Sequence, residues 1–257
     1  GNHPETGELS LTGIGRRFTR IPWRSELPWP LLLFALFGSF GAAMLGATVG
    51  AVIGGVLKLG QPAVMMLTMA GQCVELPALL LIAGVWPPPG RLCGKLGLRP
   101  PKWRDFRAAL IGLAALLPVS SVAAALWQML LESLDIDFQE KQDLLVAVAD
   151  ASLPVLVGMG VCVIIVVPVC EEIFFRRLLF GLLRPLGAWA AVAGGAALFS
   201  AAHLFLLGAP SLFLMGVAFQ LVYLWRRNLA ASMLMHAFVN LFAFVGTLLE
   251  VHGYLPE

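Results

Sequence analysis

Three ionisable residues within one apolar stretch have the types and the spacing that chemistry requires. Glu171 and Glu172 are adjacent, and Arg176 follows Glu172 by four residues. Residues four apart lie on the same face of a helix, so we expect Arg176 to neutralise Glu172. Glu171 is turned about 100° away and need not share that cation. The spacing therefore predicts one paired carboxylate and one carboxylate that is free to act.

Two imidazoles and a carboxamide follow farther along the chain. Phe199 and His203 are four residues apart, and so are His236 and Asn240. Together with Glu171, these side chains could hydrolyse an acyl group with activated water. Glu171 would take a proton from water as general base, aided by His203. His236 and Asn240 would donate hydrogen bonds to the oxyanion on the scissile carbonyl, so that no Ser or Cys nucleophile is required.

The composition places these residues in a membrane. Of 257 residues, 59% are hydrophobic and 12% are charged, against roughly 45–50% and about 25% in average soluble domains. This balance excludes a disordered chain, and a net charge of +2 does not supply the basic surface of a nucleic-acid-binding protein. An ionisable side chain inside a membrane span costs about 2.5–3.5 kcal/mol on insertion scales, which makes each one a functional candidate.

Seven apolar stretches approach or exceed the length that crosses about 30 Å of hydrocarbon. They predict an all-α, polytopic helical bundle with spans at about 29–57, 63–86, 108–131, 152–183, 187–207, 210–225 and 229–249. Three regions follow: a cytoplasmic or interfacial tail at 1–28, three spans at 29–131, and four spans at 150–250 that hold the chemical residues. The tail lacks the apolar core and the cleavage site of a signal peptide.

Two features of these spans predict how the helices pack. Gly46, Gly50 and Gly54 repeat every four residues in the first span, which indicates close contact with another helix. Counted from the neighbouring cationic turns at 1.5 Å per residue, the depths of Glu171, His203 and His236 in the membrane differ from one another. The largest difference between these depths is roughly 15 Å. We therefore expect the helices to cross obliquely, with the long fourth span tilted or bent.

The basic residues predict the orientation of the chain. Fifteen of the 17 Lys and Arg residues lie in the tail and around the turns after spans two, four and six. By the positive-inside rule the N-terminus is cytoplasmic and the C-terminus is outside. The abundance of Ala, Leu, Gly and Arg indicates a bacterium of high genomic GC content, hence a location in the inner membrane.

The set Glu171-Glu172-xxx-Arg176, Phe199-xxx-His203 and His236-xxx-Asn240 resembles the three motifs of the CPBP (CAAX protease and bacteriocin-processing, or ABI) family. That family includes the type II CAAX prenyl endopeptidases, which are intramembrane glutamate proteases. The resemblance spans about residues 150–250 and implies an all-helical fold with a polar cavity inside the bilayer. It implies that Glu171 is the base, that Glu172, Arg176 and Phe199 support it, and that His203 orients the water. It also implies an oxyanion hole of His236 and Asn240, with neither cofactor nor metal.

Other functions remain open at this stage. Glu171, His203 and His236 could bind zinc through oxygen and nitrogen, as in a zinc-dependent membrane protease, although no His-Glu-xx-His motif is present. Intramembrane Glu and His residues also form proton relays in transporters, and an inactive family member could serve as an immunity or scaffold protein. For a protease, the expected substrate is a membrane-anchored protein or peptide, cleaved in a C-terminal tail, a sorting signal or a leader. Glu75 either pairs with an arginine of another span or lines the substrate entrance.

Overall fold

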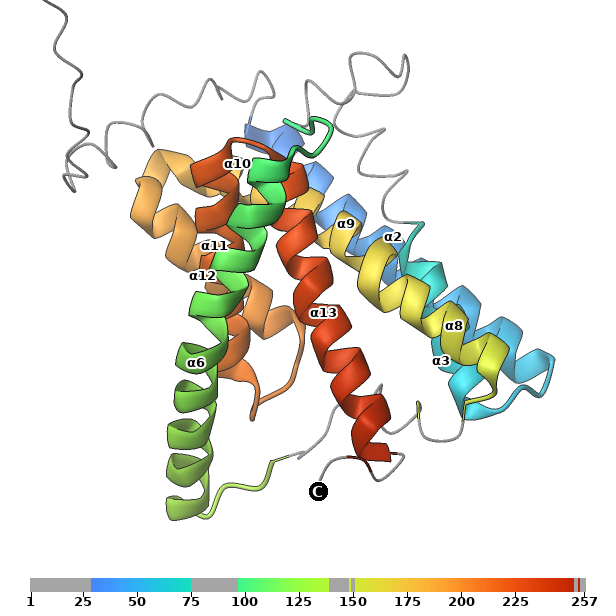
Figure 1. Cartoon of the computed structure of the whole chain (residues 1–257). Helices are drawn as coiled ribbons and strands as arrows, with labels where there is room; N and C mark the ends of the chain where they lie inside the picture. The colour runs from blue at the N-terminus through green and yellow to red at the C-terminus, as the bar shows by residue number, and fades with distance from the viewer. Residues whose placement is uncertain (1–28, 75–96, 139–147, 149–150, 252–253, 255–257) are drawn as a thin grey trace, which may run out of the picture.

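The computed structural model describes residues 29–74, 97–138, 148, 151–251 and 254 (Figure 1). Within these ranges every regular element is helical, which confirms the predicted all-α class. The N-terminal tail and Glu75 lie outside the described residues. The elements are α2 (Trp29–Val56), α3 (Gln61–Gln72), α6 (Trp103–Ser133), a long composite helix from α8 (Leu153–Val161) to η3 (Arg184–Leu186), α11 (Ala188–Ala202), α12 (Ala209–Arg226) and α13 (Leu229–Val251).

Four of the described helices are long and apolar enough to cross a membrane. They are α6, the composite helix Leu153–Leu186, α12 and α13. The apolar segment Phe40–Val56 of α2 and the helix α11 are shorter. We expected a span over residues 63–86, whereas α3 ends after 12 residues at Gln72, and residues 75–86 lie outside the described part of the chain. Large apolar side chains such as Phe37, Leu126 and Trp189 are more than 60% exposed, which suits contact with lipid rather than water. The chain is therefore an integral membrane protein with a helical bundle.

The composite fourth helix adopts a π-helical hydrogen-bonding pattern at two places near the predicted chemical residues. Two π-helical segments, η1 (Cys162–Val166) and η2 (Ile173–Leu179), flank α9 (Val167–Glu172), and α10 (Phe180–Leu183) follows. Pro168 in α9 has no backbone N–H and its ring opposes the preceding turn, which explains a widened turn directly before it. Figure 1 shows this helix inclined to α6, as the depth argument predicted.

The helix α11 is shorter than the sequence suggested. We expected a span over residues 187–207, whereas α11 ends at Ala202 and His203 caps it. Fifteen residues rise about 22 Å, less than the thickness of the hydrocarbon core. The Ser200 hydroxyl donates to the Ala209 carbonyl at 2.8 Å and Trp127 Nε1 of α6 donates to the Leu206 carbonyl at 2.9 Å. These bonds fix the turn between α11 and α12 part-way along α6.

The glycine repeat of α2 packs against α3, as predicted. A Cβ atom built on Gly46 would overlap the backbone carbonyl of Gly71, and one on Gly50 would overlap that of Leu67. A Cβ on Gly54 would lie 2.8 Å from the side chain of Val64. The two helices are therefore in backbone contact along this stripe, and no larger residue fits there without moving them.

A buried polar cluster joins the start of α6 to the turn between α12 and α13. The Asp105 carboxylate, 2% exposed, accepts from Arg226 Nε at 2.8 Å and from Asn228 Nδ2 at 3.1 Å. The Asn228 carboxamide oxygen in turn accepts the backbone N–H of Arg99 at 3.0 Å. This cluster fixes the beginning of α13, the helix that carries His236.

Candidate active site

Glu172 is fully buried and its charge is satisfied by three donors. Its relative exposure is 0%. Arg176 Nε donates to Oε2 at 3.1 Å, the Ser232 hydroxyl donates to the same oxygen, and His236 Nδ1 lies 3.1 Å from Oε1. The predicted pairing of Glu172 with Arg176 is therefore confirmed. A buried carboxylate with this many partners is a structural anion that positions the groups around it.

Arg176 is enclosed by aromatic rings on its other side. Its guanidinium carbon lies 5.0 Å from the ring centre of Phe199, 5.5 Å from that of Phe219 and 5.8 Å from that of Phe175. The negative faces of aromatic rings stabilise a cation that has been removed from water. Arg176 is 1% exposed, and the rings and Glu172 replace part of its hydration, while Nη2 is buried without a hydrogen-bond partner among the described residues.

His236 lies between the two carboxylates. Its Nδ1 faces Glu172, and its Nε2 lies 3.7 Å from Oε2 of Glu171. The Phe219 ring stacks on the imidazole with a centroid distance of 4.6 Å and an interplanar angle of 23°, which fixes the ring plane. A carboxylate that holds one imidazole nitrogen leaves the other nitrogen in a defined orientation. Here that second nitrogen faces Glu171.

Glu171 differs from its neighbour in being partly open. Its side chain is 25% exposed, and Oε2 is buried without a hydrogen-bond partner among the described residues. The separation of 3.7 Å from His236 exceeds hydrogen-bonding distance. Within the described part of the chain, this acceptor oxygen is therefore left without a hydrogen bond.

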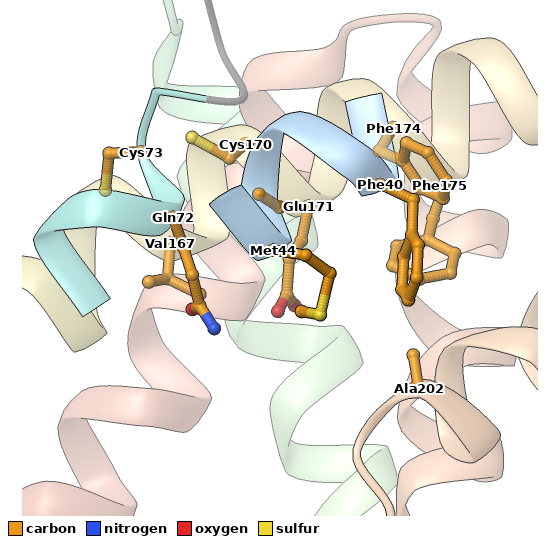
Figure 2. Close-up of a pocket in the computed structure, with 11 residues that line it drawn as sticks. Phe40, Met44, Gln72, Cys73, Val167, Cys170, Glu171, Phe174, Phe175 and Ala202 are labelled. Atoms are coloured by element: carbon orange, nitrogen blue, oxygen red, sulfur yellow. The ribbon is translucent and has the colours of Figure 1, made fainter. Parts of the chain in front are cut away.

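A cavity of about 160 Å³ adjoins Glu171. Figure 2 shows Glu171 pointing into it beside Met44 and Gln72, with Phe40 and Phe175 at one end. The walls come from helices far apart in sequence, α2, α3, α9, η2 and the end of α11, and comprise Phe40, Ala43, Met44, Gln72, Cys73, Val167, Cys170, Glu171, Phe174, Phe175 and Ala202. Of the four predicted catalytic residues, Glu171 alone belongs to this lining.

His203 is held by the helix that it caps. Its Nδ1 lies 2.8 Å from the backbone carbonyl of Phe199, and its ring centre lies 4.7 Å from the Phe199 ring. Phe199 also contacts the His236 ring, at 5.9 Å, and so lies between the two imidazoles. Among the described residues the ion-pair partner of Glu171 is His236, and the expected role of His203 in orienting water stays a prediction.

Asn240 binds the widened turn of the fourth helix. Its Nδ2 donates to the backbone carbonyl of Val163 in η1 at 2.8 Å. A carbonyl in a π-helical turn is displaced from its usual partner four residues on, so a side-chain donor from a neighbouring helix is an effective substitute. One hydrogen of the amide is used here, and Nδ2 carries a second.

Two polar residues at the site were not identified from the sequence. Ser232 precedes His236 by four residues and thus shares its helix face, a signal of the kind that linked His236 to Asn240. Gln72 gave no such signal, because its neighbours in the cavity come from other helices. As for metals, no group of three or more His, Cys, Asp or Glu in the described ranges is arranged to hold an ion.

Comparison with known proteins identifies one matching family. Residues 153–242 match the model described as Type II CAAX prenyl endopeptidase Rce1-like, and all seven predicted site residues fall inside this range. The searches of curated proteins and of solved structures give no significant match. At the level of the family, the match supports a CAAX-type intramembrane endopeptidase. The motifs, the membrane helices and the family match agree, so residues 153–242 form an Rce1-like type II CAAX prenyl endopeptidase domain within an integral membrane protein.

Proposed function

We propose that the protein hydrolyses a peptide bond in a membrane-embedded protein or peptide, with Glu171 as the base that activates water. One observation carries this proposal: Oε2 of Glu171 is buried without a hydrogen-bond partner among the described residues, in a side chain that lines a cavity. A carboxylate oxygen in that position can accept a proton from a water molecule that attacks a carbonyl held in the cavity. The oxygen of water bonds to the carbonyl carbon, and the amide nitrogen leaves with a proton.

The other site residues support this base in different ways. Glu172 holds His236 through Nδ1, so that Nε2 faces Glu171 and the proton that Glu171 carries. From there His236 can donate to the oxyanion or return a proton to the leaving nitrogen. Asn240, with its second N–H, supports the oxyanion. His203 is the water-orienting residue, because a ring that donates through Nδ1 to a backbone carbonyl has Nε2 as an acceptor.

The cavity indicates the kind of substrate. A cavity of about 150 Å³ lined by apolar side chains holds a benzene molecule, so the roughly 160 Å³ beside Glu171 fits one medium-sized apolar side chain rather than a whole lipid chain. We therefore propose that the cleaved bond lies in an extended apolar segment, such as a C-terminal tail, a sorting signal or a leader. In this scheme residues 150–250 contain the catalytic helices, and the three N-terminal helices contribute to substrate recognition.

The membrane location follows from the same scheme. We place the protein in the inner membrane of a bacterium, with the N-terminus in the cytoplasm and the C-terminus outside. The segment before α6, η3 and the turn between α12 and α13 lie toward one end of the bundle, the upper end in Figure 1. These segments carry the basic residues Arg99, Lys102, Arg184, Arg226 and Arg227, which the positive-inside rule assigns to the cytoplasm.

The test compares membrane proteins of cells that make the wild-type chain, the Glu171→Gln variant or no chain. New N-termini and C-termini in the membrane fraction are identified by mass spectrometry. We expect a set of termini that requires the wild-type chain and is absent with Glu171→Gln, because the amide cannot take a proton from water. Glu132→Gln, at the far end of α6 and bonded to Gln128, is the matched control and should leave those termini unchanged.

Two further arms separate the alternatives. The peptide that contains the identified bond is incubated with purified protein, with and without a metal chelator. If the chelator abolished cleavage and zinc restored it, a bound metal ion and not the Glu171 carboxylate would be the group that activates water. Identical termini in all three cell lines would contradict the protease proposal and leave a transporter or an immunity or scaffold protein as the explanation.

A further inference from the structure

The cavity beside Glu171 contains a polar side chain from outside the matched domain. Gln72 is the last residue of α3, and it lines the cavity together with Glu171. Figure 2 shows the Gln72 carboxamide and the Glu171 carboxylate extending to the same side from their two helices. Residues 153–242 match the family model, so the N-terminal helices add a group that the domain itself does not supply.

The position of Gln72 is rigidly defined. The preceding residue, Gly71, is in backbone contact with Gly46 of α2, and α3 also packs against α8 and η1. The backbone N–H groups of Cys73 and Val74 donate to the carbonyls of Ala70 and Gly71 at 3.1 Å, which continues the turn past Gln72. A side chain on such a supported helix end keeps the accuracy that a catalytic contact needs.

The carboxamide of Gln72 makes no hydrogen bond to a described residue. The side chain is half-buried, and Val167 lies beside it in the cavity (Figure 2). A substrate that fills the cavity would displace water from this amide, which costs free energy unless a partner replaces the water. The partner that fits is a group on the substrate. The two N–H bonds of the amide are matched by a carbonyl oxygen.

The chemistry at Glu171 requires such a donor in this cavity. When water activated by Glu171 attacks a carbonyl, negative charge develops on the carbonyl oxygen and needs preorganised N–H groups. His236 and Asn240, the oxyanion donors proposed above, are not among the residues that line the cavity. Gln72 does line it, and its amide N–H groups would add a further donor from α3.

We propose that Gln72 is a catalytic residue, whose carboxamide donates a hydrogen bond to the carbonyl oxygen of the peptide bond that Glu171-activated water attacks. This assignment rests on the proposed function. Gln72 transfers no proton: the oxygen of water bonds to the carbonyl carbon, and the carbonyl electron pair moves to oxygen. When that pair returns, the C–N bond breaks, and the leaving nitrogen takes the proton that Glu171 removed from water and passed to His236. The catalytic site is then shared between α3 and the matched domain.

The test replaces the donor without changing the size of the side chain. Gln72→Met and Gln72→Glu keep the length of glutamine but remove the N–H groups. The substrate is the internally quenched peptide that spans the bond identified with the wild-type and Glu171→Gln chains. Loss of one oxyanion donor typically lowers kcat by about 10²–10³-fold, so we expect both variants to fall by at least tenfold in kcat with KM changed less than threefold. The control is Gln61→Met, the same substitution at the exposed start of α3.

Two measurements separate a contact in the transition state from a structural role. Thermal unfolding in detergent should give midpoints for both Gln72 variants within about 2 °C of the wild type. In the Glu171→Gln background, Gln72→Met should leave the dissociation constant of the uncleaved peptide unchanged. A kcat for Gln72→Met within threefold of the wild type would overturn the assignment, and so would a change confined to KM. If Gln72→Met does not fold, the kcat of Gln72→Glu decides by the same criterion. A wild-type rate for Glu171→Gln would instead overturn the proposed function.

Discussion

Glu171 and Glu172 are neighbours in the chain, but their carboxylates occupy different surroundings. Glu172 is fully buried and bonded to Arg176, Ser232 and His236. Glu171 is 25% exposed, and one of its oxygens has no hydrogen-bond partner among the described residues. A one-residue step along the helix, about 100°, therefore separates a fully bonded carboxylate from one that keeps an open acceptor oxygen.

The buried pair predicts a large effect on stability. Arg176→Met leaves Glu172 buried without its cation, and breaking a buried pair in this way typically costs about 3–5 kcal/mol. We expect a clearly lower midpoint of thermal unfolding in detergent for Arg176→Met. The double variant Glu172→Gln/Arg176→Met removes both charges and should recover part of the loss. The pairing would be contradicted if the free energy of unfolding lost in the double variant equalled the sum of the losses in Glu172→Gln and Arg176→Met alone.

At this scale the sequence predicted contacts within one helix and missed contacts between helices. The Glu172–Arg176 pair follows from a spacing of four, which is a property of the helix itself. The partner of Glu171 does not, because the choice between His203 and His236 depends on where α11 ends and how α13 is inclined. Ser232 and Gln72 were missed for the same reason: their partners or neighbours lie on other helices.

At the scale of elements, the contact between α2 and α3 shapes the substrate cavity. The glycine stripe brings the two backbones together, and these helices then supply Phe40, Met44 and Gln72 to the cavity beside Glu171. The repeat of glycines every four residues predicted a close contact but not its partner. The N-terminal helices, which match no motif, thus form much of the wall opposite the matched domain.

This contact can be tested with paired glycine substitutions in α2. Gly50→Ala places a methyl group against the Leu67 carbonyl, and overpacking of this kind typically costs about 1–3 kcal/mol. We expect a lower unfolding midpoint and a higher KM for Gly50→Ala, since the cavity wall moves. Gly55→Ala in the same helix meets no atom within 4 Å and serves as the control. Equal behaviour of the two variants would show that α2 and α3 are not in contact.

At the scale of the whole molecule, hydropathy alone predicted the class of fold, because each helix is apolar along its own length. It placed a helix in each of the seven expected stretches, and the described helices agree apart from the ends of α3 and α11. The second span was expected to reach residue 86, whereas α3 ends at Gln72 and residues 75–86 lie outside the described part of the chain. The oblique arrangement in Figure 1 followed from a mismatch in depth rather than from any local pattern. The π-helical turns had no local sequence signature except Pro168, because they depend on which backbone groups neighbouring helices can satisfy.

The distribution of charge predicts the orientation of the molecule. Reporter domains that are active on one side of the membrane are fused in turn to the N-terminus and to the C-terminus. We expect the N-terminal fusion to report the cytoplasm and the C-terminal fusion to report the outside. Activity of both fusions on one side would contradict an odd number of spans. Activity on exchanged sides would contradict the assignment of the basic end to the cytoplasm.

The π-helical turn η1 (Cys162–Val166) holds one residue more than an α-helical turn. A chain one residue shorter within η1 could therefore close this turn as an ordinary α-helix and leave Glu171 facing the cavity. The same deletion within the α-helical segment α8 has no such turn to absorb it at that point and would rotate the residues that follow by about 100°. Relatives of this protein should therefore tolerate a deletion within η1 better than one within α8.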